Sequence, residues 1–113
     1  MSLAAQKRGP ELVIFADREI DLSNAERFEE RLDAARSRTR RICLDFTQCE
    51  FIDAGGLRLV LHTARDMRAE GGELSVDKLR GEVARIFEIT GMLVEGSPVV
   101  RGAAQTPRDD SPG

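Results

Sequence analysis

Residues 44–61 read LDFTQCEFIDAGGLRLVL. The segment begins as a strand-like run, passes through a turn that ends at Asp53, and continues through two glycines into an apolar helix. This order places the start of a helix at the edge of a sheet, where free backbone N–H groups and the helix dipole favour a negative charge. A hydroxyl at this turn would be well placed for phosphorylation. The sequence offers none, because no Ser or Thr lies between Thr47 and Thr63 and the chain contains no Tyr.

The segments on either side of this turn alternate between strand and helix patterns. Ser23 and Glu26 form a capping-box pattern at the start of the first helix, and the strand over 40–46 alternates as if one face were buried. We therefore expect an α/β domain with a mostly parallel sheet of four to five strands and three to four helices. Strands are predicted over 11–20, 40–46, 72–76 and 92–100, and helices over 24–36, from the two glycines to Gly71, and from Val83 to Gly91.

The chain has the length of about one domain, which we place at residues 11–100. Residues 1–10 end in Gly-Pro, a pattern typical of a flexible lead-in or of a short edge strand that stops at the proline. Residues 101–113 are polar and rich in Gly and Pro without apolar periodicity, which predicts a disordered tail.

Composition and charge exclude several classes of function. A net charge of −3 argues against nucleic-acid binding, and we interpret the basic segment 36–41 as a solvated turn between a helix and a strand. Cys43 and Cys49 form neither a CxxC pair nor a Cys/His ligand set, so we expect no metal site and a reduced, cytoplasmic setting. No apolar run is long enough to enter a membrane, and no glycine-rich phosphate loop predicts a nucleotide cofactor.

Three motifs in order resemble the STAS domain of bacterial anti-sigma factor antagonists. They are REID at 18–21, LDFT at 44–47 followed by FIDAGGL at 51–57, and FEITGM at 87–92. The resemblance covers roughly residues 11–100 and implies a STAS-type fold. It also implies a non-enzymatic protein that binds an anti-sigma factor and so regulates transcription.

In that family, the second hydroxyl of a DSSG turn is phosphorylated by the anti-sigma factor, which is a serine kinase, and the phosphorylated antagonist is released. The resemblance places Ala54 and Gly55 at the two serines, with Gly55 at the acceptor position. Neither residue can carry a phosphate. The partner-binding residues that the resemblance implies are Asp21, Asp53, Ala54, Gly55, Gly56, Leu57, Arg58 and His62.

Each of these residues also has a structural interpretation, and the sequence leaves both open. Asp53 is suited to cap the helix that follows it, the two glycines suit a tight turn, and Asp21 suits the end of a strand. Arg58 and His62 belong to a polar helix face that is solvated in most proteins.

Two other functions stay open on the sequence. A STAS accessory subunit of a membrane lipid transporter, bound to an ATPase subunit, would need no phosphate switch. A thiol or hydrolytic enzyme using Cys49, His62 and Asp53 is disfavoured because the spacing matches no established signature. STAS domains commonly end in a further helix that 101–113 does not show, and an uncovered face there favours a homodimer.

Overall fold

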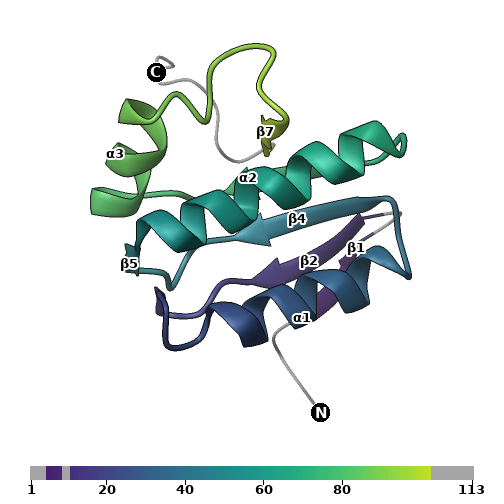
Figure 1. Cartoon of the computed structure of the whole chain (residues 1–113), viewed down its shortest axis with the longest axis horizontal. Helices are drawn as coiled ribbons and strands as arrows, with labels where there is room; N and C mark the ends of the chain where they lie inside the picture. The colour runs from purple at the N-terminus through teal and green to yellow at the C-terminus, as the bar shows by residue number, and fades with distance from the viewer. Residues whose placement is uncertain (1–4, 9–10, 103–113) are drawn as a thin grey trace.

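Five strands form the main sheet of the protein (Figure 1). The computed structural model describes residues 5–8 and 11–102. In spatial order the strands are β1 (Ala5–Arg8), β2 (Glu11–Phe15), β4 (Arg41–Asp45), β6 (Glu73–Asp77) and β7 (Val99–Arg101). The edge strand β1 is antiparallel to β2, and every other neighbouring pair is parallel. The predicted α/β class with a mostly parallel sheet is confirmed.

Three helices complete the described part of the chain: α1 (Ala25–Arg36), α2 (Ala54–Ala69) and α3 (Gly81–Ile89). Figure 1 shows that α1 and α2 begin at the same end of the molecule and lie side by side over one face of the sheet. A short parallel pair, β3 (Glu19–Ile20) with β5 (Phe51–Ile52), lies at the start of α2, and α3 contacts β5. This pair holds the turn that the sequence singles out.

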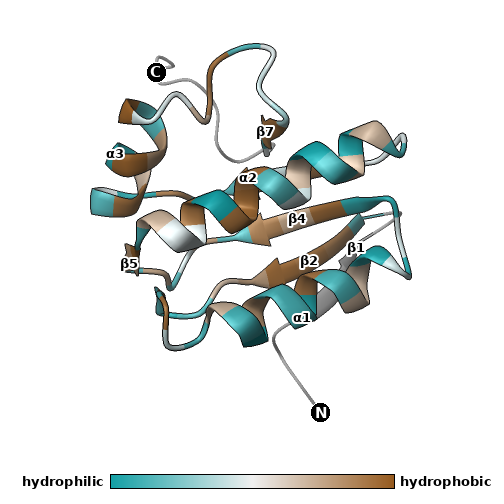
Figure 2. Cartoon of the chain, viewed as in Figure 1, coloured by the Kyte–Doolittle hydropathy of each residue, from teal (hydrophilic) through white to brown (hydrophobic). Residues whose placement is uncertain are grey.

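The hydrophobic core lies between the sheet and the helices. Figure 2 shows apolar residues along β2 and β4, on the layer that α1 and α2 cover. Phe46, which follows β4, meets Phe87 of α3 edge to face with ring centroids 5.4 Å apart, so α3 joins the same core. The fully buried side chains include Phe28 and Leu32 of α1, Val60 and Ala64 of α2, and Leu44 and Val76 of the sheet.

The predicted strand over 11–20 is two strands. After β2, the N–H of Ala16 donates to the carbonyl of Asp45 at 2.9 Å, and the chain then leaves the main sheet. It resumes as β3, which pairs with β5 instead. The change of partner is what carries the chain to the turn before α2.

The prediction of one buried face for 40–46 is wrong. Ile42 and Leu44 are buried as expected, but Cys43 and Asp45 on the alternate face are only 2% and 5% exposed. The reason is topological, because β4 lies between β2 and β6 at the centre of a parallel sheet, and such sheets are buried on both faces.

The predicted capping box at Ser23 is also wrong. The N-cap of α1 is Asn24, and no side chain caps this helix. The Ser23 hydroxyl instead donates to Oδ1 of Asp21 at 2.6 Å, and Asn24 Oδ1 accepts from the Asp21 N–H at 2.9 Å. These residues build the turn that leads into α1 rather than the first turn of the helix.

The last predicted strand is shorter than 92–100. Met92 and Leu93 are buried in a run of turns. Within this segment only β7 is a strand, and it pairs with β6. The sheet continues to Gly102, whose N–H donates to the carbonyl of Val76 at 2.8 Å. Residues 103–113 lie outside the described part of the chain, so the disordered tail, the missing final helix and the homodimer remain predictions.

The packing of α3 makes a stability prediction. Phe87 is fully buried and Ile89 on the same helix is 73% exposed. We expect Phe87→Ala to lower the free energy of unfolding by roughly 3–5 kcal/mol, because it removes a buried ring and leaves a cavity. Ile89→Ala should change it by less than about 0.5 kcal/mol. Urea unfolding of both variants measures the difference, and equal losses would mean that α3 does not pack as described.

Candidate functional site

Asp53 fixes the start of α2. Its Oδ1 accepts from the N–H of Gly56 at 2.8 Å, and its carbonyl accepts from the N–H of Leu57 at 3.0 Å. Its own N–H donates to the carbonyl of Ile20 at 3.0 Å, which fastens the turn to β3. Asp53 is therefore the N-cap of α2, and its carboxylate has a structural role in the described chain.

The two glycines of the turn have different roles. Gly56 is buried, and a Cβ at this position would lie 2.8 Å from Ile20 Cγ2 and 2.8 Å from Ile52 Cγ1. Gly55 is exposed, and a Cβ there would lie 3.4 Å from Asp53 Oδ1, an ordinary contact. Packing therefore requires glycine at 56 and leaves position 55 open to other residues.

Asp21 organises the second turn at this end of the molecule. Its Oδ1 accepts from both the N–H and the hydroxyl of Ser23, at 2.9 and 2.6 Å. The carbonyl of Asp21 accepts from the N–H of Asn24 at 3.1 Å. This hydrogen-bonded turn presents Leu22, which is 90% exposed.

A groove runs between the starts of α1 and α2. We call it the α1–α2 groove, and its volume is about 510 Å³. Gly55 is one of the lining residues, so the position that the sequence resemblance assigns to the phosphate acceptor opens onto this groove. The lining residues are Leu22, Ala25, Glu26 and Glu29 on the α1 side, and Gly55, Arg58, Leu59 and His62 on the α2 side.

The structure sorts the predicted partner-binding residues into two groups. Gly55, Arg58 and His62 meet in the α1–α2 groove, and the exposed Ala54 adjoins it. The others support it: Asp21, Asp53, Gly56 and Leu57 hold turns or pack on the core. The sequence reasoning missed Leu22, Glu26 and Glu29. Their signal was an apolar residue inside a polar turn, followed by acids at helical spacing.

The proposed thiol site does not assemble. Cys49 is buried, its thiol donates to the carbonyl of Phe51 at 3.4 Å, and burial raises the pKa of the thiol. His62 is exposed on α2 and its imidazole has no hydrogen bond within the described residues, while the Asp53 carboxylate accepts from the N–H of Gly56. A buried thiol with a raised pKa is a poor nucleophile. The part of the chain that the structure describes also contains no cluster of three His, Cys, Asp or Glu residues arranged to hold a metal ion.

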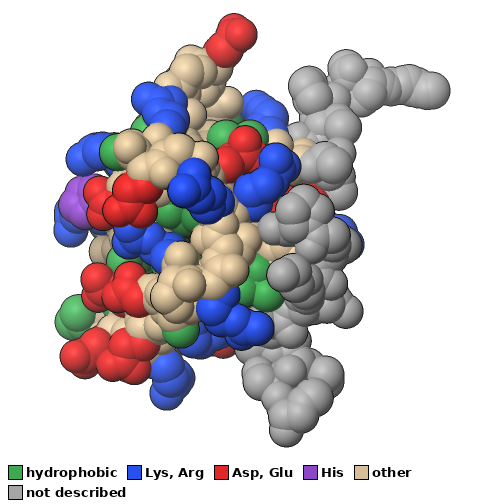
Figure 3. All heavy atoms as spheres, turned by 90° about the vertical axis from the view of Figure 1, so that its right-hand side faces the viewer, with side chains coloured by type: hydrophobic (Ala, Val, Ile, Leu, Met, Phe, Trp, Pro, Cys, Tyr) green, Lys and Arg blue, Asp and Glu red, His purple; other side chains and the backbone are tan. Residues whose placement is uncertain are grey.

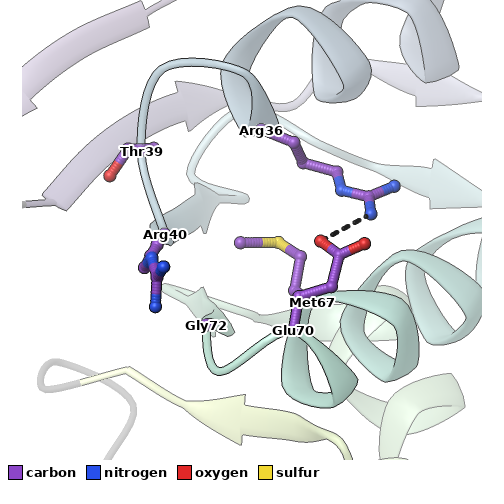
Figure 4. Close-up of a pocket in the computed structure, with 6 residues that line it drawn as sticks. All are labelled: Arg36, Thr39, Arg40, Met67, Glu70 and Gly72. Atoms are coloured by element: carbon purple, nitrogen blue, oxygen red, sulfur yellow. Dashed lines mark hydrogen bonds and ion pairs between the residues drawn. The ribbon is translucent and has the colours of Figure 1, made fainter.

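A second, smaller cavity lies at the far end of the helices. α2 is about 24 Å long, and the cavity of about 180 Å³ adjoins its last turn (Figure 4). Arg36 bridges the two helices there, since its guanidinium lies 3.2 Å from Glu70 Oε1. Figure 3 shows acidic and basic side chains mixed over this end of the molecule. The basic segment 36–41 therefore lies among acidic side chains and does not form a single basic patch. The cavity is lined by Arg36, Thr39, Arg40, Met67, Glu70 and Gly72.

Residues 3–95 match the family model described as Mlab, STAS domain. The chain belongs to the STAS domain family. It is 34% identical over 94 residues to BtrV of Bordetella bronchiseptica, whose name assigns it to the anti-sigma factor antagonists; the match covers 82% of this chain and 81% of BtrV.

Solved structures of STAS proteins share the fold. An anti-sigma factor antagonist from Mycobacterium paratuberculosis superposes with a TM-score of 0.73 at 22% identity, covering 88% of this chain and 84% of the other. Phosphorylated SpoIIAA of Bacillus, a cell fate determinant, gives a TM-score of 0.65 at 20% identity over 88% of this chain and 89% of SpoIIAA. Among the described helices of this STAS domain, none combines the length and hydropathy needed to cross a membrane.

The two glycines give a matched pair of variants. We expect Gly56→Ala to lower the free energy of unfolding by about 1–3 kcal/mol, because the new methyl would overlap two buried isoleucines. Gly55→Ala should keep or raise stability, by at most about 1 kcal/mol, because alanine favours the helix and fits the open position. Thermal and urea unfolding of both variants test this, and a loss at position 55 as large as that at 56 would contradict it.

The cap at Asp53 gives a second pair. Asp53→Ala should lower the free energy of unfolding by about 1 kcal/mol, because the N–H of Gly56 loses its acceptor. Asp53→Asn keeps an acceptor oxygen and should stay within a few tenths of a kcal/mol of wild type. If urea unfolding shows the two variants equally destabilised, charge rather than the hydrogen bond carries the effect.

Proposed function

We propose that this protein is a non-enzymatic anti-sigma factor antagonist that docks the Asp53 turn and the start of α2 onto an anti-sigma factor. The observation that carries the proposal is the position of Gly55, exposed at the start of a capped helix and opening onto the α1–α2 groove. The STAS family and the similarity to BtrV support the choice of an antagonist. The cytoplasm, where sigma factors act, is the setting that this role requires.

Gly55 changes how such an antagonist is controlled. A partner of the serine-kinase type has no hydroxyl to modify at Ala54 or Gly55, so the usual release by phosphorylation is lost. Nothing in the packing of position 55 demands glycine, since a Cβ there meets only an ordinary contact. The protein would then stay competent to bind, with control passing to its abundance or to the partner.

The exposed Gly55, which lines the α1–α2 groove and has no hydroxyl, also favours the accessory-subunit role. A STAS subunit that holds the ATPase of a membrane lipid transporter needs a stable contact and no phosphate switch. The two roles use the same surface and differ in the partner recovered. Co-purification from the source organism followed by mass spectrometry separates an anti-sigma kinase from a transport ATPase.

The decisive measurement uses the purified protein with each anti-sigma kinase of its source. We expect one kinase to form a complex that persists in the presence of ATP, with no phosphate incorporated into the wild-type chain. Gly55→Ser restores the hydroxyl at an open position, and we expect that variant to be phosphorylated and released. Complex formation by size-exclusion chromatography and phosphate by mass spectrometry give the two readouts.

One control variant and two contrary outcomes make the result informative. Gly55→Ala restores a side chain without a hydroxyl and should bind like wild type in ATP. A Gly55→Ser variant that binds but is never phosphorylated would place the partner outside the kinase type. The antagonist role would be refuted if no anti-sigma factor formed a complex and a transport ATPase were recovered instead.

A further inference from the structure

The walls of the α1–α2 groove carry opposite charges. Glu26 and Glu29 lie on the α1 side, and Arg58 and His62 lie on the α2 side. Each pair has the spacing that places two side chains on one face of a helix. All four residues are exposed, and none of their side chains makes an ion pair or hydrogen bond within the described residues.

The two walls do not neutralise each other across the groove. Elsewhere the charged side chains of α1 are paired: Arg31 lies 3.2 Å from Asp17 in the segment between β2 and β3, and Arg36 lies 3.2 Å from Glu70 at the end of α2. In the groove, no acidic oxygen of Glu26 or Glu29 comes within ion-pair distance of the opposite wall. The charges are therefore available to a third chain that lies between them.

Apolar surface lies between these walls. Leu22 is 90% exposed at one end, and Ala25 and Leu59 are partly buried along the groove. An exposed leucine held by a hydrogen-bonded turn is suited to insert between side chains of a partner. Burying this side chain would favour a complex, because it removes apolar surface from water.

The groove suits a helix better than an extended peptide. Its walls are two helices, whose backbone groups beyond the first turn are already bonded within each helix. No strand residue lines the groove, so an extended peptide lying in it would have no strand edge to pair with, whereas a helix satisfies its own backbone and presents side chains at matching spacing.

We propose that the α1–α2 groove receives one amphipathic helix of the partner protein. That helix carries an apolar stripe for Leu22 and Leu59, basic side chains toward Glu26 and Glu29, and acidic side chains toward Arg58 and His62. The inference rests on the proposed function, because it takes the partner to be the protein that the Asp53 turn contacts. It adds the α1 wall and Leu22 to that contact and fixes the orientation of the bound helix through the charge order.

The test compares variants that differ only in where one charge is reversed. Glu29→Lys lies on the groove, and Glu30→Lys is the same change at an exposed α1 residue outside its lining. We expect Glu29→Lys to weaken binding to the anti-sigma factor by about tenfold or more, and Glu30→Lys by less than about threefold. Isothermal titration calorimetry at low and physiological salt measures both, with circular dichroism to confirm that each variant is folded.

Two further variants test the rest of the groove. Leu22→Ser and Arg58→Glu should each weaken binding by about tenfold or more, since both side chains are exposed and their loss leaves the core unchanged. A cross-linker placed at Leu22→Cys should join the protein to a partner peptide with apolar residues at helical spacing between basic and acidic ones.

The outcomes separate this inference from the proposed function. If wild type binds and all three groove variants bind like it, while Ala54→Arg at the turn weakens binding, the groove inference is overturned and the antagonist function stands. A cross-linked segment of a single charge, or one that is not helical in the partner, would also overturn it. If wild type binds no anti-sigma factor, both proposals fail.

Discussion

The contact between Gly56 and the β3–β5 pair is the constraint on which this end of the molecule depends. The backbone of α2 approaches Ile20 and Ile52 so closely that a Cβ at position 56 would lie 2.8 Å from both side chains. Asp53 holds the helix in that place by accepting from the N–H of Gly56 and donating to the carbonyl of Ile20. The start of α2, and with it the groove, is set by these two residues.

Because of this division, the shape of the turn does not depend on whether position 54 or 55 carries a hydroxyl. Asp53 and Gly56 face inward and meet the fold's requirements, whereas Ala54 and Gly55 face solvent. The residues that a kinase would read are therefore not the residues that hold the helix. A substitution at position 54 or 55 can therefore add or remove a hydroxyl without disturbing the contacts that hold α2.

The sequence predicted a helix or strand well where the spacing of its apolar residues reflects packing on one side only, as for a helix that packs on the sheet. The stripe Leu57, Val60, Leu61 and Ala64 located α2, and the acid before two glycines located its cap. The prediction failed for two different reasons. The burial of Cys43 follows from β4 being central in the sheet, which local pattern does not show. The role of Ser23 follows from a competing local partner, because the carboxylate of Asp21, two residues earlier, accepts the hydrogen bond of the hydroxyl.

The lining of the groove was predicted on the α2 side only, because the predicted Asp21 precedes α1 but is not a lining residue. The motif lies in the α2 segment, so sequence comparison within that segment points to Gly55, Arg58 and His62 and is blind to α1. The α1 side of the groove becomes part of the candidate site only because α1 and α2 run side by side from the same end of the sheet. Leu22 joins through the Asp21 turn, which fixes its backbone with hydrogen bonds to Ser23 and Asn24. A side chain presented on a backbone that is already ordered loses less freedom on binding, so this turn favours docking.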